Sequence, residues 1–97
     1  MKKELFIQTV SFEWDEEKNK ANIEKHGYSF VDAAKALCGS CLVTLSNRND
    51  EIRYLAIGMA LDRLIAVIYT ERHDKIRIIS ARRARKKEED EYRELYG

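Results

Sequence analysis

The chain has 97 residues, of which 44% are apolar and 36% are charged, and its formal net charge is +1. This length suits one domain over residues 1–97, with a small core and a heavily charged surface. The longest apolar run, Leu64–Tyr69, is far shorter than the ~18 residues that span a bilayer, and no signal peptide is visible, so we expect a cytoplasmic protein without a membrane partner.

The first part of the sequence predicts one strand followed by two helices. Leu5–Trp14 contains the apolar–polar alternation of a strand. Asp15 suits the N-cap of a helix, and Gly27 suits the left-handed residue that ends it. Ser29 then caps a second helix, over Phe30–Leu37, whose apolar residues recur at helical spacing.

The second part predicts four strands and a final helix. The strands are expected at Cys41–Leu45, Glu51–Ala60, Leu64–Arg72 and Ile76–Ser80. Short turns join the last three, so these form an antiparallel meander, and the strand that is apolar on both faces takes a central place. The helix is expected over Ala81–Tyr96. The class is therefore α+β, with helices layered on an antiparallel sheet.

Basic charge is concentrated near the C-terminus. Residues 71–87 carry eight Lys or Arg against two acids, and residues 88–97 carry five acids against one Arg. Such a basic block is an electrostatic footprint for phosphate or nucleic acid. The alternative interpretation, a solvated helix with a fringe of salt bridges, stays open from charge alone.

Several sequence blocks together resemble one family. They are Phe12-Glu13-Trp14-Asp15, Lys18, Asn22, Lys25-His26-Gly27, Arg53-Tyr54, Tyr69-Thr70-Glu71-Arg72 and Arg77-Ile78-Ile79-Ser80-Ala81-Arg82-Arg83-Ala84. Their order, from about Phe12 to Tyr92, closely resembles the BrnT family of small bacterial ribonuclease toxins. Each piece alone is weak, but the combination is specific.

The resemblance implies a fold, an activity and partners. It implies a RelE-like twisted antiparallel sheet with N-terminal helices packed on one face and a C-terminal helix. The implied activity is that of a metal-independent endoribonuclease toxin, without a cofactor, which cleaves RNA and so inhibits translation and growth. The implied partner is a BrnA-like antitoxin with a ribbon-helix-helix part, and operator DNA is bound only through the toxin–antitoxin complex.

Two departures from the family pattern bear on this expectation. Residues 1–11 form an extra N-terminal segment, in which we expect an edge strand. The loop Ser46–Asp50 is short and carries Arg48 where many relatives have a His and further acids. This favours the alternative function, a non-catalytic relative that acts as an antitoxin-binding or RNA-binding module.

RNA cleavage by attack of the 2′-hydroxyl needs a base, cations that stabilise the phosphorane, and an acid for the leaving oxygen. Arginine suits the second task because its planar fork binds phosphate oxygens bidentately. Histidine, with an unperturbed pKa near ~6.5, suits proton transfer, although His26 also suits a helix C-terminus. Glu71 shares a strand face with Tyr69 and is a further candidate base. The predicted catalytic residues are His26, Arg53, Glu71, Arg72, Arg77 and Arg82.

A second set of residues is predicted to bind RNA without taking part in the chemistry: Lys25, Arg48, Tyr54, Lys75, Arg83, Arg85 and Lys86. We expect strand ends and the adjoining last helix to bring the cations together at one rim. Surface salt bridges are the alternative for each cation. His73 is a less favoured candidate, and Trp14 is expected in the core.

Cys38 and Cys41 form a CxxC motif that needs its own interpretation. A zinc site would need a second ligand pair at suitable spacing, which the sequence does not offer, so no metal site is predicted. A redox motif belongs at a helix N-terminus, whereas this one follows a helix. We therefore expect two incidental thiols. A thiol redox protein, the third class, would need a depressed thiol pKa.

Overall fold

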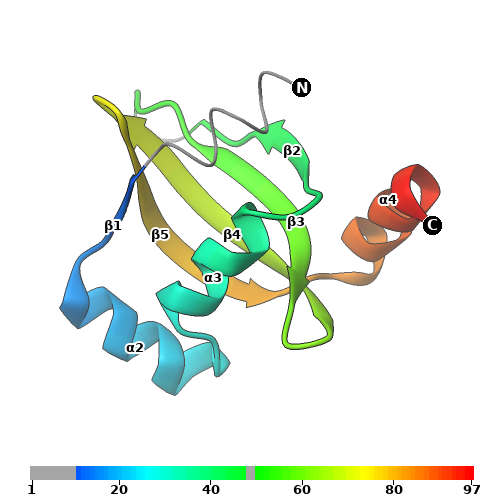
Figure 1. Ribbon diagram of the computed structural model, residues 1–97, viewed down its shortest axis with the longest axis horizontal. Coiled ribbons are helices and arrows are strands. Elements are labelled where there is room, and N and C mark those ends of the chain that lie inside the picture. Colours follow the sequence, from blue (N-terminus) through cyan, green and yellow to red (C-terminus); the bar gives the residue numbers. More distant parts are fainter. Residues whose placement is uncertain (1–10, 48–49) are drawn as a thin grey trace.

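The computed structural model describes residues 11–47 and 50–97, which form three helices and a five-stranded sheet (Figure 1). The elements are β1 (Ser11–Glu13), α2 (Glu16–His26), α3 (Phe30–Leu37), β2 (Leu42–Leu45), β3 (Tyr54–Ala60), β4 (Arg63–Arg72), β5 (Lys75–Arg83) and α4 (Lys86–Tyr96). The predicted α+β class is confirmed. None of the helices in this described part is long and apolar enough to cross a membrane.

The strands lie in the order β1-β5-β4-β3-β2, so β4 is central, as its apolar sequence predicts. β2 to β5 are antiparallel, but β1 pairs in parallel with β5, and the sheet is therefore mixed rather than wholly antiparallel. Of the predicted strand Leu5–Trp14, Ser11–Glu13 forms an edge strand. The rest of that prediction lies outside the described residues.

The two faces of the sheet carry separate cores, because successive strand residues point to opposite sides. Ile65 and Val67 of β4 pack with Phe30 of α3, and Trp14 meets the Phe30 ring edge-on at a centroid distance of 6.2 Å. On the other face, Ala66 packs in a smaller core with residues of α4. Among the described residues, α4 covers only part of the face opposite α3, near β2 and β3.

Helix α2 is fixed at its two ends and in its middle. The Asp15 carboxylate accepts hydrogen bonds from two backbone N–H groups of the first turn, and Gly27 ends the helix at φ 81°. In the middle, buried Asn22 donates to the carbonyls of Tyr28 and Ala81 at 2.8 Å and accepts from the Ala81 N–H at 3.2 Å. The amide of Asn22 therefore takes the place of a neighbouring strand along the edge of β5 beyond β1.

The end of β5 differs from the sequence prediction. The helix expected from Ala81 begins only at Lys86, because residues 81–83 continue the strand and pair with β4. Ser80 pairs with Ile68 and Ile78 with Tyr69, so Ile79 is an extra, bulged residue. Residues 81–83 have good helix propensity, but pairing with the central apolar strand β4 decides their conformation. Local propensity does not include this tertiary effect.

Candidate functional site

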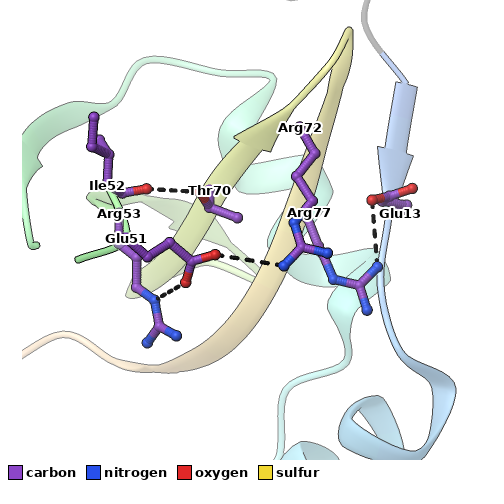
Figure 2. A network of polar contacts seen from close by, with 7 residues as sticks. All are labelled: Glu13, Glu51, Ile52, Arg53, Thr70, Arg72 and Arg77. Carbon is purple, nitrogen blue, oxygen red and sulfur yellow. Dashed lines mark hydrogen bonds and ion pairs between the residues drawn. The ribbon is translucent and has the colours of Figure 1, made fainter. Parts of the chain in front are cut away.

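Three arginines lie on the partly covered face near the β4–β5 hairpin; we call Arg53, Arg72 and Arg77 the arginine cluster. Arg77 pairs with Thr70 and Lys75 with Arg72 across the antiparallel ladder, so these side chains share one face. Arg72 and Arg77 are therefore diagonal neighbours, as Figure 2 shows. Arg53 joins them from the segment that precedes β3. The prediction that Arg77 faces away from Ile76 and Ile78 is confirmed.

Glu51 links two members of the cluster. One of its carboxylate oxygens accepts from Arg53 Nε at 2.8 Å, and the other lies 3.5 Å from Arg72 Nη2 (Figure 2). The hydrogen bond from Arg53 is the main reason why the pKa of the Glu51 carboxyl lies below its ordinary value. Glu51 therefore stays ionised near neutral pH and holds the two guanidinium groups on either side of it.

Glu13 holds the third member. Its carboxylate lies 3.4 Å from Arg77 Nη1 and 4.0 Å from Lys75 Nζ. The parallel pairing of β1 with β5 sets Glu13 directly beside Arg77. Four cations thus face these two carboxylates, while the acids Asp50 and Glu71 lie beside Glu51 and Arg72. What suits phosphate here is the set of guanidinium groups rather than the net local charge.

Thr70 anchors the segment that carries Glu51 and Arg53. Its side chain is almost fully buried, and its hydroxyl donates to the Ile52 carbonyl at 2.7 Å. The Ser46 N–H donates to the Arg53 carbonyl at 2.8 Å and closes the loop at its base. A depression of ≈390 Å³ lies here, lined by Asp50, Glu51, Ile52, Tyr54, Thr70, Glu71 and Arg72.

Arg82 belongs to a second group at the far end of β5. It pairs with Ala66, whereas Arg77 pairs with Thr70, which separates the two arginines by roughly 15 Å along the strand at ~3.3 Å per residue. Both terminal nitrogens of Arg82 donate to Glu88 of α4 at 2.9 Å. This bidentate pair raises the Arg82 pKa and lowers the Glu88 pKa. The expectation that all the cations meet at one rim is wrong, because they occupy both ends of β5.

The bulge at Ile79 decides which way Arg82 faces. Without it, residues 77 and 82 would lie on opposite faces of the strand, since side chains alternate with a period of two. The extra residue reverses the alternation, so Arg82 beside Ala66 shares the face of Arg77 beside Thr70. The two cationic groups therefore lie along one side of the sheet.

Tyr54 and Glu71 belong to the face of the strands that packs on α3, and both reach the depression beside Arg72. The Tyr54 ring stacks on Tyr69 at a centroid distance of 5.2 Å, and both rings pack against the α3 core. Burial raises the pKa of Tyr69 to about 12, so its phenol is a poor base. Glu71 pairs with Ile76 on that same face. Alternation along the strands starts these side chains on the opposite face from Arg53, but Tyr54 and Glu71 line the same depression as Glu51 and Arg72.

The remaining predicted residues are scattered. Lys25 and His26 are exposed at the end of α2, and within residues 11–47 and 50–97 neither side chain contacts the arginine cluster through a hydrogen bond or ion pair. Arg83 is exposed at the end of β5, Arg85 is exposed just before α4, and Lys86 pairs with Asp90 at 3.0 Å. The prediction for Arg48 lies outside the described residues.

Sequence reasoning missed the carboxylates and the anchor. Glu13, Glu51 and Glu88 each hold an arginine, and Thr70 holds the loop. The available signals were the position of Glu13 within the opening signature, and the spacing of Glu51 two residues before Arg53. Neither signal specifies a partner that comes from another strand, so the pairs appear only in three dimensions.

Cys41 has the setting of a buried structural thiol rather than that of a redox thiol. Cys41 donates its thiol to the Ala36 carbonyl at 3.0 Å, and burial raises the Cys41 pKa to about 11, opposite to the depression that a redox thiol needs. No group of three or more His, Cys, Asp or Glu suited to a metal ion occurs among the described residues.

Comparison with known proteins gives one family. No curated protein matches the chain. The family model described as a ribonuclease toxin, BrnT, of type II toxin–antitoxin systems matches residues 14–88, about three quarters of the sequence. That span contains the whole arginine cluster, Asn22 with its hydrogen bonds to Ala81 of β5, and Glu88. The chain therefore belongs to the BrnT family of type II toxin–antitoxin ribonuclease toxins, a family whose members have an antitoxin partner.

Proposed function

We propose that this chain is an endoribonuclease toxin that cleaves RNA in the bacterial cytoplasm without a metal ion, and so inhibits translation and growth. The observation that carries the proposal is the arginine cluster. Arg53, Arg72 and Arg77 gather from three segments on a part of the sheet that no helix among the described residues covers. Guanidinium groups placed there suit the charge that develops on a phosphorane, which is the largest demand of this reaction.

The chemistry assigned to the cluster is attack of a ribose 2′-hydroxyl on the adjacent phosphate. The 2′-oxygen forms a bond to phosphorus, the bond to the 5′-oxygen breaks, and the products are a 2′,3′-cyclic phosphate and a 5′-hydroxyl. The arginines stabilise the phosphorane between these steps. Beside them, Glu13 supplies a carboxylate and His73 is exposed in the turn between Arg72 and Lys75, so groups that can take the 2′-hydroxyl proton and protonate the leaving 5′-oxygen flank the cluster.

We further propose a BrnA-like ribbon-helix-helix antitoxin as the partner, and binding of operator DNA only by the complex. The family membership supports an antitoxin, and the three guanidinium groups of the cluster support a partner or substrate with negative charge. Covering the cluster would block RNA from it.

The alternative is a non-catalytic module that binds antitoxin or RNA. One observation favours it: within residues 11–47 and 50–97, no histidine side chain bonds to the arginine cluster. Such a module would bind RNA in a salt-dependent manner and leave it intact.

Cleavage by the purified protein separates the two functions. Mixed-sequence RNA is incubated with the protein in EDTA, and the termini of any products are determined. We expect fragments with 5′-hydroxyl and 2′,3′-cyclic phosphate ends. R72A should reduce the rate by about 10²–10³-fold, whereas R63A, an exposed arginine at the opposite end of the same strand, should not. Intact RNA with salt-dependent binding would instead support the module.

A further inference from the structure

The arginine–carboxylate pairs at Glu51 and at Glu88 differ in how many guanidinium nitrogens remain available to a phosphate. Arg53 gives Glu51 only its Nε, and Arg72 gives one terminal nitrogen at 3.5 Å. No other hydrogen bond to these two guanidinium groups occurs within residues 11–47 and 50–97. Arg82, by contrast, gives both terminal nitrogens to Glu88. Phosphate can therefore reach Arg53 and Arg72 without displacing Glu51, but must displace Glu88 to bind Arg82 in the same bidentate manner.

Glu51 is also fixed relative to the sheet. Its neighbour Ile52 accepts the hydrogen bond from buried Thr70, and Arg53 accepts one from Ser46 through its carbonyl. Figure 2 shows the Glu51 carboxylate between the Arg53 and Arg72 guanidinium groups, with the Thr70–Ile52 bond beside them. One carboxylate thus sets the relative position of two long side chains, each of which alone has many rotamers.

We propose that Glu51 is a positioning residue, which braces Arg53 and Arg72 as two arms of one site for an RNA phosphodiester. This rests on the function proposed above and adds the residue that organises its phosphate site. Glu51 acts through the arginines. The two arginines that hold its carboxylate also reduce its affinity for a proton, so it is poorly suited to be the base itself.

Two roles of Glu51, bracing the arginines or competing with phosphate for them, predict opposite effects of its removal on RNA binding. If Glu51 only competed with phosphate, removing its charge would strengthen RNA binding. If it braces the arginines, its removal leaves two side chains to be immobilised when RNA binds, which weakens binding despite the added positive charge. Glutamine tests this because its amide has one acceptor oxygen and cannot hold both arginines.

The experiment compares E51Q and E51D with E94Q, which makes the same charge change on exposed Glu94 of α4. Binding is measured with a mixed-sequence 2′-O-methyl RNA 12-mer, which lacks the attacking hydroxyl, and kcat and KM with the cleavable RNA of the same sequence. We expect E51Q to bind about three- to tenfold more weakly and to lose about 10–100-fold in kcat. E51D, which keeps both carboxylate oxygens, should recover part of the lost RNA affinity and part of the lost kcat. E94Q should bind RNA like the wild type or slightly more tightly.

Binding by E51Q that is unchanged or tighter than that of E94Q would overturn the proposal. So would an unchanged kcat. Circular dichroism and thermal unfolding verify that E51Q is folded, as the partial exposure of Glu51 leads us to expect. If the wild-type protein leaves RNA intact, the proposed enzyme fails, but the binding measurement still decides whether Glu51 braces a phosphate site.

Discussion

Asn22 should contribute a large share of the folding stability, through its bonds to the edge of β5. Asn22→Ala removes hydrogen bonds to two carbonyls and one N–H, all in a buried setting. At about 1 kcal/mol for each bond, less about 0.5 kcal/mol for the better helix propensity of alanine, the loss is about 2–3 kcal/mol. For a chain of this size that lowers Tm by roughly 10–20 °C.

The assay is urea and thermal unfolding, with Lys20→Ala as the control from the same helix. Lys20 is exposed, so its variant should stay within about 0.5 kcal/mol of the wild type. Hydrogen exchange gives a local measurement, because the Ala81 N–H donates to Asn22. The N22A substitution should speed exchange of the Ala81 N–H more than it speeds exchange of the Val67 N–H in the central strand. A Tm within 3 °C of the wild type (roughly the measurement error) and unchanged exchange at Ala81 would refute the assigned role.

Two further stability predictions follow from other contacts. Glu88→Gln should destabilise the protein by about 1 kcal/mol at pH 7, because it breaks the charged pair with Arg82 and weakens the cap on the Arg85 N–H. Because the folded-state pKa of Glu88 is lowered, its contribution to stability is present above the ordinary carboxyl pKa and is lost as pH falls through the folded-state pKa. Urea unfolding from pH 7 to pH 3 should therefore show the stabilities of the wild type and E88Q converge. A difference in stability that persists at pH 3 would contradict this. Gly58→Ala should cost about 1–3 kcal/mol in urea unfolding, because its Cβ would lie 3.0 Å from the Ala36 carbonyl oxygen and 3.1 Å from Cys41 Sγ. Gly39→Ala, whose nearest contact is 3.8 Å, is the matched control, and equal effects of the two would show that close packing is not the cause.

Much of the fold could be predicted because its signals are local. The cap at Asp15, the left-handed Gly27 and the cap at Ser29 place both early helices correctly. The prediction fails where pairing with β4 decides the structure. Residues 81–83 have helix-forming character yet extend β5, and nothing in the local sequence marks Ile79 as a bulge.

The candidate site divides in the same way. The face of Arg77 follows from simple alternation, but that of Arg82 follows only once the bulge is known. Tyr54 and Arg53 are neighbours in the sequence and start on opposite faces, although Tyr54 lines the depression that contains Glu51 and Arg72. The opening signature, which suggested chemistry at His26, has a structural explanation in Asn22 and Gly27. Partners such as Glu13 and Arg77 come from distant segments, which a single sequence does not connect.

The most direct test of the central claim is to map new RNA 5′ ends in a bacterial host that expresses the chain without an antitoxin. The wild type is compared with R53A/R72A/R77A and with K20A/K35A/R63A, a control that removes three exposed cations elsewhere. We expect growth arrest and new 5′-hydroxyl ends with the wild type and the control, and neither with the cluster variant. Equal cleavage by the cluster variant at equal soluble expression would contradict the assignment of the site. No new ends with well-expressed wild type would contradict the enzyme itself.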